Sequence, residues 1–558
     1  METENISRLL LTKAQQLGPK KALCLHGGDV AEQYTYSQLN EASGRLAAEF
    51  IERGIQADDT IALLCDSRPR WGIVFFATVR AGGVLVPLDF RMSTAELDEI
   101  LAQTKPKILL VSRELEAVAT ELVINALCDI QVMSVEAAYT DTTYPSIDVP
   151  AQTALHPCVS RRENDSAIIT FTSGTTGSSK GVITTYGNLL HQIRSLRQIV
   201  RNDANTVCVS ILPLCHLFEL TAGFLGALYG GGCIAYCNTL LPDEILAAMQ
   251  EHEPTCMVTV PLFLKLLATS IRKEVAGQSR FRRALFALSI NAAVLLPMSV
   301  RRWLFSPIHK RLGGKFEYFV SGGAPLDVAT LRFFDQIGMP VFQGYGLAET
   351  SPVITTNGPR ANRPGSVGKP LPGVELKISD ASQGEILTRG PHVMRGYLGD
   401  PALTSELIDS DGWLHTGDIG HIDKDGYLFV SGRKKNIIVL GSGKKVQPEE
   451  VEAVLFEHPY MKEGCVVGAI ADRGLLKGTE EVCAVAVPSE DAIRHCKDDS
   501  LDLGVIVRSA IEQQAQRLSP FKRPTRIILS NRPLPRTTSK KIRRHNLFEW
   551  LAQEAILS

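Results

Sequence analysis

A chain of 558 residues exceeds the size that a single hydrophobic core supports, so we expect two or more domains. Hydrophobic residues make up 44% of the sequence and charged residues 21%, a balance that excludes a disordered chain. The formal net charge of −1 gives no electrostatic basis for binding nucleic acid, so we expect no nucleic-acid partner.

Cysteine usage and the first residues bear on the compartment. The 12 cysteines are scattered, and the pair Cys233 and Cys237 lacks zinc-type partners, which favours reduced thiols and a cytoplasmic location. Residues 1–21 contain no basic region followed by a long apolar core. We therefore expect no signal peptide.

Two stretches of the sequence are uncharged and long enough to raise the question of a membrane segment. Three glycines interrupt residues 220–242, which predicts a buried helix followed by a buried strand and not a membrane span. Residues 284–300 contain Pro297 and lie between two pairs of arginines. This pattern fits a core helix, and it also fits a helix at a membrane surface or along a substrate tunnel, so these interpretations stay open.

Strand-like and helix-like segments alternate in the first part of the chain. Ser37 begins an amphipathic helix that ends at Gly54. Residues 60–64, 84–86 and 108–111 are predicted strands with helical sequence between them. This alternation predicts a parallel sheet with helices on both faces.

The most informative stretch follows a polar connection at residues 136–165. Residues 167–172 form a short apolar, β-branched run, which is typical of a buried strand. Residues 173–181 then combine glycines and hydroxyls with Lys180. Glycines let the backbone approach a ligand, while N–H groups, hydroxyls and a cation bind an anion. We interpret the segment as a phosphate-binding loop in preference to a flexible one. It is not a Walker A loop, because Ser179 stands where that motif has glycine.

Two further strands run into turns of small residues. Residues 316–320 are a predicted strand before the turn Ser-Gly-Gly-Ala-Pro at 321–325, where a flat ring can lie against the backbone. Residues 341–350 place Tyr345 and Glu349 after another strand. We interpret Tyr345 as stacking on adenine and Glu349 as a ligand of Mg²⁺, with a turn carrying a solvated glutamate as the alternative.

A hairpin and a helix are predicted next along the chain. The dipeptide Asp-Gly at 425–426 lies between apolar runs, as in a hairpin turn. Asp418 can accept from both hydroxyls of a ribose, and Arg433 can donate to the same sugar or to phosphate. A charged, exposed hairpin is the alternative. Pro448 suits the first turn of a helix.

The C-terminal part predicts a compact α+β unit. Its predicted elements are strands at 465–470, 482–487 and 526–529 and a helix at 503–518. A basic run at 533–544 follows these elements. Taken by itself, such a run is ordinarily a solvated patch.

The segment TSGTTGSSKG at 172–181 resembles the phosphate-binding signature of the adenylate-forming enzymes, which include acyl-CoA synthetases, luciferases and peptide-synthetase adenylation domains. Five motifs follow the order of that family along nearly the whole chain, and residues 302–314 resemble its long-chain fatty acyl-CoA synthetase branch. The resemblance implies an α/β fold with a large N-terminal domain of mixed β-sheets packed with helices (1–432). The resemblance also implies a hinge (433–436) and a small mobile α+β C-terminal lid domain (437–558).

The resemblance also implies which residues form the nucleotide site. The implied catalytic residues are Lys541, Glu349, Lys180 and Thr176, and Glu349 and Thr176 are also the implied ligands of Mg²⁺. ATP and AMP contact a larger set, namely Thr172, Ser173, Gly174, Thr175, Thr176, Gly177, Lys180, Gly322, Gly323, Ala324, Gly344, Tyr345, Gly346, Thr350, Asp418 and Arg433.

Other positions are assigned by the same resemblance. His216 and Phe218 line the acyl pocket, although a lone histidine beside aromatics is more often a packed core residue. Gly443 and Lys444 contact CoA, and Lys435 is the hinge residue.

The implied function is an ATP-dependent ligase with ATP, Mg²⁺ and CoA. It activates a medium- to long-chain fatty acid as an acyl adenylate and transfers the acyl group to CoA. Four alternatives stay open: acyl-carrier protein as the acceptor, an aromatic or other acid as the substrate, a serine-type acyl hydrolase using Ser442 to Lys445, and a non-catalytic lipid-binding relative. Peripheral membrane contact also stays open, and no oligomeric state is predicted.

Overall fold

The computed structural model describes most of the chain. Outside the described residues lie 1–4, 28–31, 126–128, 137–143, 148–157, 174–178, 238, 380–383, 472–477, 500–501, 537–541, 545–546, 553–555 and 558.

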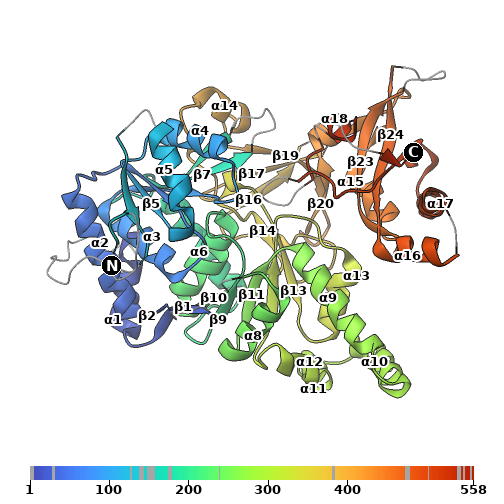
Figure 1. Cartoon of the computed structure of the whole chain (residues 1–558), viewed down its shortest axis with the longest axis horizontal. Helices are drawn as coiled ribbons and strands as arrows, with labels where there is room; N and C mark the ends of the chain where they lie inside the picture. Colours follow the sequence, from blue (N-terminus) through green and yellow to red (C-terminus); the bar gives the residue numbers. More distant parts are fainter. Residues whose placement is uncertain are drawn as a thin grey trace. The chain divides into compact units, whose positions relative to one another are not determined.

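The described chain divides into two compact units (Figure 1). The first contains residues 1–376 and 388–414, and the second contains residues 377–387 and 415–558. Both units combine helices with sheets, so the predicted α/β fold with a large N-terminal and a small C-terminal part is confirmed. The hinge at 433–436 concerns motion and stays a prediction.

A nine-stranded sheet is one of two large sheets in the first unit. Its strand order is β15-β14-β13-β12-β11-β9-β10-β1-β2. The six strands from β13 to β1 in this order are parallel to their neighbours, while the strands at both edges are antiparallel. The bounds are β1 (Lys21–His26), β2 (Gln33–Thr35), β9 (Val207–Ser210), β10 (Cys233–Cys237), β11 (Cys256–Thr259), β12 (Tyr318–Ser321), β13 (Val341–Tyr345), β14 (Thr355–Thr356) and β15 (Lys369–Pro370).

The other large sheet has seven strands in the order β18-β8-β7-β4-β3-β5-β6. The predicted strands at 60–64, 84–86 and 108–111 are its parallel centre, and β7 and β8 form an antiparallel hairpin beside them. The bounds are β3 (Thr60–Leu64), β4 (Val84–Leu88), β5 (Ile108–Val111), β6 (Gln131–Ser134), β7 (Ser166–Ser173), β8 (Ser179–Thr185) and β18 (Gly396–Tyr397).

Helices cover both faces of these sheets, as the alternation of elements predicts. Successive residues of a strand point to opposite faces, and in β1 Leu23 belongs to one hydrophobic core while Cys24 belongs to another. The helices of the first unit are α1 (Ile6–Leu17), α2 (Tyr36–Glu52), α3 (Pro69–Ala81), α4 (Thr94–Thr104), α5 (Glu116–Asn125), α6 (Tyr186–Ile199), α7 (Gly226–Gly230), α8 (Pro242–His252), α9 (Pro261–Ala276), α10 (Arg280–Ala293), α11 (Met298–Leu304), α12 (Ser306–Arg311), α13 (Val328–Gln336) and α14 (Pro401–Leu407).

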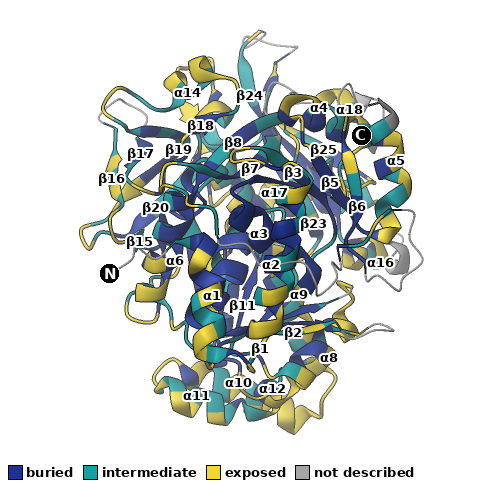
Figure 2. Ribbon diagram, turned by 90° about the vertical axis from the view of Figure 1, so that its left-hand side faces the viewer, coloured by how far each residue is buried: buried dark blue, intermediate teal, exposed yellow. Residues whose placement is uncertain are grey.

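The largest core joins the two sheets through α2, α3 and α6. It contains Leu23 of the nine-stranded sheet and Leu63 of the seven-stranded sheet, with Trp71 and Phe75 of α3 between them. Every residue of α3 is buried, and the helix is almost uniformly dark blue in Figure 2. A mostly apolar helix is expected in this position, because it has no face to offer to water, and its two arginines, Arg70 and Arg80, are buried with it.

The capping residue of the helix predicted at Ser37 is wrong by two residues. Helix α2 begins at Tyr36, and the capping residue is Thr35, whose side chain accepts from the backbone N–H of Gln38. The Gln38 side chain accepts in return from the N–H of Thr35, at 2.9 Å. This reciprocal capping box stabilises the end of the helix in a way that a hydroxyl two residues later does not.

The second unit contains two four-stranded sheets and a small hairpin. The first sheet has the order β16-β17-β19-β20 and the other β23-β24-β25-β26, while β21 pairs with β22. The bounds are β16 (Glu375–Ile378), β17 (Glu385–Arg389), β19 (Leu414–Ile422), β20 (Leu428–Arg433), β21 (Ile438–Val439), β22 (Lys445–Val446), β23 (Met461–Ile470), β24 (Glu480–Pro488), β25 (Arg526–Ser530), β26 (Ile556–Leu557), α15 (Pro448–Leu455), α16 (Glu490–Asp499), α17 (Leu503–Ala515) and α18 (Leu547–Ala552). The predicted strands, the hairpin and the helix starting at Pro448 are confirmed.

Neither uncharged stretch forms a membrane span. Residues 219–230 are helical and lead into β10, as the sequence predicts. Across the described part of the chain, no helix combines the length and the apolar character needed to cross a membrane. The Arg-flanked stretch is not a core helix throughout, because Leu285, Leu288 and Leu295 are exposed while Phe286 and Ile290 pack against the core.

Candidate active site

The predicted phosphate loop is the tip of the β7–β8 hairpin. Thr172 pairs with Lys180 and Ser173 pairs with Ser179, so both ends of the loop are held by the strand ladder. The candidate residues Gly174, Thr175, Thr176 and Gly177 lie outside the described residues, as does the side chain of Ser173. Their contacts with phosphate and Mg²⁺ stay predictions.

Lys180 and Glu349 meet at a tyrosine that sequence reasoning missed. The Lys180 ammonium lies 5.6 Å from the centroid of the Tyr397 ring. The Tyr397 hydroxyl donates to Oε1 of Glu349 at 2.8 Å. Burial, and then the Glu349 carboxylate, raise the pKa of the Tyr397 phenol, so it stays a neutral donor near pH 7. The structure therefore joins two of the predicted catalytic residues through one buried ring.

Strand pairing explains this arrangement. The short strand β18 adds to the outer edge of β8, with Tyr397 opposite Val182. Lys180 lies two residues before Val182 on β8, so the side chains of Lys180 and Val182 point to the same face of the sheet. The side chain of Tyr397, the partner of Val182, points to that face as well. The backbone N–H of Met394 donates to the carbonyl of Glu349 at 2.9 Å, which fixes the turn that carries this carboxylate.

Tyr345 and Glu349 belong to a turn that is tightly closed on itself. Tyr345 ends β13 and is half-buried. A Cβ on Gly346 would lie 1.8 Å from the carbonyl oxygen of Pro352, so only glycine fits there. The buried hydroxyl of Thr350 accepts from the N–H of Leu347 at 2.8 Å. Thr350 therefore holds the shape of the turn, and its contact with the nucleotide stays a prediction.

The small-residue turn after β12 brings the acyl-pocket and nucleotide candidates together. A Cβ on Gly322 would lie 3.0 Å from the ring of Phe218, so this ring already lies against the glycine. Gly323 has a φ of +80° and open space where a Cβ would point, and Ala324 is exposed beside it. Phe218, a candidate for the acyl pocket, thus lies against Gly322, a candidate for the nucleotide site.

His216 contacts an ion pair that the sequence did not reveal. Arg91 donates to both carboxylate oxygens of Asp89, at 2.8 and 2.6 Å. Nη2 of Arg91 also lies 3.0 Å from Nε2 of His216. Burial opposes ionisation of Asp89, but the hydrogen bond and charge of Arg91 hold its pKa below the usual range. In the sequence, the only signal for Asp89 and Arg91 is that they follow directly after strand β4.

A buried carboxyl group lies next to Phe218. Glu219 is almost fully buried at the start of a π-helical segment (Glu219–Leu225), and Oγ of Ser210 donates to it at 2.6 Å. Burial raises the pKa of Glu219 to about 8, although the Ser210 hydrogen bond opposes the shift. We therefore expect Glu219 to keep its proton near pH 7.

The Glu219→Gln variant is expected to be more stable than the parent protein at neutral pH. The folded protein keeps a proton that the unfolded chain releases above about pH 4.5, so this group lowers stability as pH rises from about 4.5 to about 8. A glutamine has no proton to lose, and its gain is on the order of 2 kcal/mol at pH 7 and small at pH 4.5. Urea unfolding at pH 4.5, 6 and 8 measures the difference, with the exposed Glu457→Gln as the control. A gain that does not change with pH would contradict the protonated state.

The second unit brings together the two residues assigned to the ribose. Asp418 and Arg433 are opposite each other on β19 and β20, and Nε of Arg433 lies 2.8 Å from Oδ1 of Asp418. The Asp418 side chain is buried, whereas that of Arg433 is partly exposed. The guanidinium therefore orients the carboxylate, as expected for a group that accepts hydrogen bonds from two hydroxyls. The contact with ribose stays a prediction.

The remaining candidates lie in the second unit. Gly443 is at the tip of the turn between β21 and β22, with a φ of +76° and open space at its Cβ position. The ammonium of Lys444 lies 4.5 Å from the centroid of the Phe521 ring, and Lys435 is exposed. Lys541 lies outside the described residues. The turn is confirmed, while the roles in CoA binding, hinge motion and catalysis stay predictions.

Comparisons with known proteins identify the family to which this chain belongs. The profile of a family described as "AMP-binding enzyme" matches residues 11–398, and that of the "AMP-binding enzyme C-terminal domain" matches residues 450–541. A similar curated protein is the long-chain-fatty-acid–CoA ligase FadD15 of Mycobacterium bovis. It is 29% identical over 456 residues, which cover 77% of this chain and 74% of that protein.

Other similar proteins carry different names. The oxalate–CoA ligase of Arabidopsis thaliana is 27% identical over 581 aligned residues and covers 98% of both chains. Among solved structures, ATP-bound MatB from Rhodopseudomonas palustris superposes with a TM-score of 0.77 at 27% identity, covering 99% of each chain. The likeness thus extends over both units of the chain, whereas the acids named by these relatives differ.

Proposed function

Because this chain belongs to the AMP-binding enzyme family, as an AMP-forming acid–CoA ligase, we propose that it activates a fatty acid as an acyl adenylate and transfers the acyl group to CoA. The observation that carries this proposal is the joining of Lys180 and Glu349 through Tyr397 beside the phosphate-loop hairpin.

The chemistry explains why such an enzyme needs a nucleotide. A carboxylate is a poor acyl donor, because its leaving group would be oxide. Attack of the carboxylate oxygen on the α-phosphorus of ATP releases pyrophosphate and forms a mixed anhydride with AMP. The thiol of CoA then attacks the carbonyl carbon and AMP leaves, so a thioester and a proton are formed.

The residues of this chain supply charge and orientation for the first step. Lys180 is held over the Tyr397 ring and offers a cation for the negative charge of the phosphates. Tyr345, at the end of β13, offers a ring to the base. Asp418, oriented by Arg433, offers a carboxylate to the ribose hydroxyls. Holding the nucleoside in this way turns binding energy into alignment of the reacting oxygen and phosphorus.

Glu349 fits the proposed role of a Mg²⁺ ligand. It is half-buried, and its Oε1 already accepts from Tyr397, which orients the carboxylate. Carboxylate oxygen is a donor that Mg²⁺ prefers, usually together with phosphate oxygens and water. When bound, the ion would add positive charge beside the phosphates.

A fatty acid is favoured as the substrate by three observations. Residues 302–314 resemble the long-chain fatty acyl-CoA synthetases. Two relatives with 28–29% identity are named as ligases of long- and medium-chain fatty acids. Phe218 supplies an apolar ring at the candidate acyl pocket.

ATP–pyrophosphate exchange with a panel of acids tests the substrate. The panel runs from acetate to palmitate and includes oxalate and benzoate. We expect exchange to increase with chain length to at least eight carbons, at roughly 0.8 kcal/mol for each buried methylene group. Exchange with oxalate or benzoate alone would contradict the fatty-acid assignment and leave the ligase class intact.

The acceptor is tested separately. Acyl adenylate is supplied to the enzyme with either CoA or acyl-carrier protein, and thioester formation is followed. We expect turnover with CoA, and turnover with carrier protein alone would contradict the proposal. The hydrolase alternative predicts thioester cleavage without ATP and labelling of Ser442, which lies on the exposed turn between β21 and β22.

We also propose that α10 and α11 dock on an anionic lipid surface. Residues 275–316 contain eight basic residues and no acidic one, in a chain whose net charge is −1; the eight are Arg280, Arg282, Arg283, Arg301, Arg302, Lys310, Arg311 and Lys315. Several of them are engaged within the fold, as Arg301 is with Asp335. Arg280, Arg282 and Arg283 are exposed at the start of α10.

Large apolar side chains are exposed on the same segment. Phe281 is 76% exposed, Leu288 69%, Leu295 88% and Trp303 75%. The opposite side of α10 packs through Phe286 and Ile290 against the core, so the fold uses only one of two apolar faces. Figure 2 shows exposed surface along α10 and α11. Exposed rings and leucines beside arginines match an anionic bilayer, which offers phosphate groups above an apolar interior.

Vesicle sedimentation tests the docking surface. We expect the protein to bind vesicles containing phosphatidylserine at least tenfold more tightly than vesicles of phosphatidylcholine alone, at about 1 kcal/mol for each basic residue engaged. The double variant Phe281→Gln/Leu288→Gln is expected to lose most of this binding. The matched control is Leu241→Gln, which changes an exposed leucine elsewhere. Absence of binding to either vesicle, or a dimer that the double variant dissociates, would contradict the lipid assignment.

A further inference from the structure

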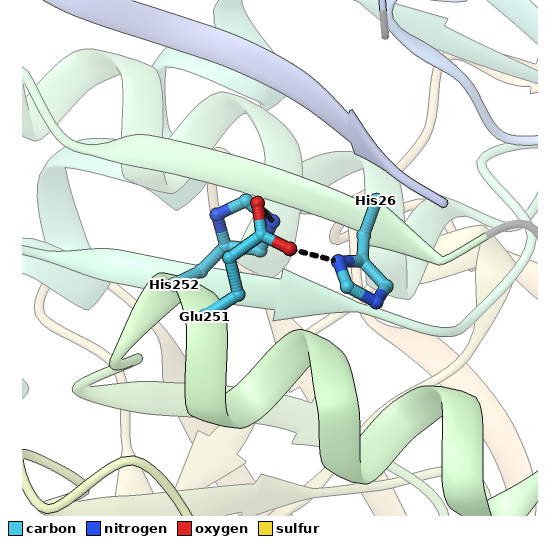
Figure 3. A group of neighbouring side chains, drawn as sticks. All are labelled: His26, Glu251 and His252. Atoms are coloured by element: carbon cyan, nitrogen blue, oxygen red, sulfur yellow. Dashed lines mark ion pairs between the residues drawn. The ribbon is translucent and has the colours of Figure 1, made fainter. Parts of the chain in front are cut away.

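Two histidines and a glutamate converge at a place that the proposed ligase chemistry does not use (Figure 3). His26 is the last residue of β1, and Glu251 and His252 are the last two residues of α8. Nδ1 of His26 lies 2.8 Å from Oε2 of Glu251, and Nε2 of His252 lies 3.7 Å from Oε1. One atom from each of the three side chains lies within 4.8 Å of the other two.

The fold explains why residues so far apart in the sequence meet. Cys24 and His26 are two positions apart on β1, so their side chains point to the same face of the sheet. Helix α8 covers that face, because Ile245 and Met249 share a hydrophobic core with Cys24. The C-terminal end of α8 therefore places its last side chains beside His26.

The two imidazoles are largely covered, and one nitrogen of each is buried without a hydrogen bond that satisfies it. The side chains of His26 and His252 are only 10% and 11% exposed. Among the described residues, Nδ1 of His26 and Nε2 of His252 have no hydrogen-bond partner of acceptable geometry, although both face the Glu251 carboxylate. Buried polar atoms in folded proteins are nearly always satisfied, so these two nitrogens indicate a missing ligand.

A neighbouring thiol orients one of the rings. Nδ1 of His252 lies 4.0 Å from Sγ of Cys24. If Nδ1 carries the proton and points to the sulfur, the lone pair of Nε2 points to Glu251. A metal-binding histidine commonly uses its second nitrogen in this way, which fixes the tautomer and the direction of the ring.

We propose that His26, Glu251 and His252 form a binding site for a first-row divalent transition-metal ion, with Zn²⁺ as the best match. Two imidazoles and a carboxylate are ligands that Zn²⁺ takes, and donors at 2.0–2.1 Å in a tetrahedron are about 3.4 Å apart. Glu251 is 62% exposed, so its carboxylate is free to adjust by the small distance required. The exposed side leaves the fourth position to water.

The surroundings favour a cation at this position. The C-terminal end of a helix carries partial negative charge, and Glu251 and His252 end α8. The second group of potential ligands in the described chain, Asp89, Cys215 and His216, is different. There the Arg91 guanidinium already bonds to Asp89 and lies 3.0 Å from His216, so a positive charge occupies that group.

Bound metal would link the end of α8 to the end of β1. Its expected effect is therefore on stability and not on the adenylation chemistry, since none of the three ligands belongs to the candidate active site. The metal proposal and the proposed function can therefore fail independently. A protein without zinc binding could still be a ligase, and a protein without ligase activity could still bind zinc.

Zinc titration of the full-length protein tests the site. The protein is stripped with EDTA, exchanged into metal-free buffer and titrated with ZnCl₂ against a chromophoric zinc chelator. We expect the parent protein to bind one equivalent more than the His26→Gln or His252→Gln variant. The exposed Glu251→Gln change is expected to weaken this equivalent at least tenfold without disturbing folding. Zinc is also expected to raise the melting temperature of the parent protein and not that of His26→Gln.

A matched variant separates the site from general zinc binding by thiols and histidines. His421→Gln removes an exposed imidazole that stacks on Phe429 in the second unit. We expect this variant to keep the full zinc content. Equal zinc content in the parent, His26→Gln, His252→Gln and Glu251→Gln proteins would overturn the proposal, and so would an equal loss in His421→Gln.

Discussion

The Lys541→Ala variant is expected to lose adenylation while keeping thioester formation. Lys541 is the lysine that the family resemblance assigns to the reacting carboxylate and the α-phosphate. Removing a cation from charge that develops on the phosphates lowers such rates by about 100-fold or more. The second half-reaction starts from a finished acyl adenylate and does not need this cation. ATP–pyrophosphate exchange should therefore fall, whereas supplied acyl adenylate and CoA should react near the parent rate.

Lys540, the preceding residue in the sequence, offers a matched control for Lys541. Residues 537–541 are bounded by a β-bridge between Arg536 and Ile542. Just beyond, Arg544 bonds to Glu452 at 2.5 and 2.9 Å, so the C-terminal side of this segment is anchored. Lys540→Ala removes the same charge one residue away. If Lys540→Ala stops exchange and Lys541→Ala does not, the assignment is off by one residue.

The Glu349→Gln variant is expected to show the other large loss. Glutamine keeps the shape of the side chain and can still accept from Tyr397, but it has no negative charge for Mg²⁺. We expect pyrophosphate exchange to fall about 100-fold at a fixed Mg²⁺ concentration and to recover in part as Mg²⁺ is raised. Recovery distinguishes a lost metal ligand from a collapsed turn.

Two further variants help to interpret the expected loss of activity in Glu349→Gln. Tyr397→Phe removes only the hydrogen bond of 2.8 Å that orients the Glu349 carboxylate. One hydrogen bond is worth about 0.5–1.5 kcal/mol, so a loss of roughly two- to tenfold is expected. Glu375→Gln removes an exposed carboxylate that pairs with Arg389 and should leave exchange unchanged. If Glu349→Gln behaves like Glu375→Gln, Glu349 does not take part in the reaction.

The substrate remains the main difference between the family and the individual enzyme. The relatives share both matched regions with this chain, but their names include oxalate and long-chain fatty acids. We propose that the phosphate-loop hairpin and the Tyr345–Glu349 turn bind ATP. We expect the acyl pocket to select the acid. Phe218, His216 and the Asp89–Arg91 pair are therefore the residues to mutate when substrate preference is tested.

Much of the fold could be predicted because its signals are local. The strand before the phosphate loop, the hairpin at Asp425 and Gly426 and the helix beginning at Pro448 each follow from a few adjacent residues. Alternation, turn glycines and helix-start residues act over one to four positions, so they are visible in the sequence. Even here the cap of α2 was missed, because Ser37 and Thr35 offer the same hydroxyl and only the reciprocal bonds of Thr35 and Gln38 decide between them.

By itself the sequence determined the order of elements, the glycine-rich turns and the set of residue types that suit ATP. Only the tertiary structure decided which of them meet. Tyr397 reaches Glu349 because β18 pairs with the edge of β8, and His26 meets Glu251 because α8 crosses the face of β1. Such contacts join residues 48 and more than 200 positions apart, and they depend on strand order and helix packing. No periodicity within a short segment carries that information, since the hydrophobic pattern of an element records that it is buried and not which element it is buried against.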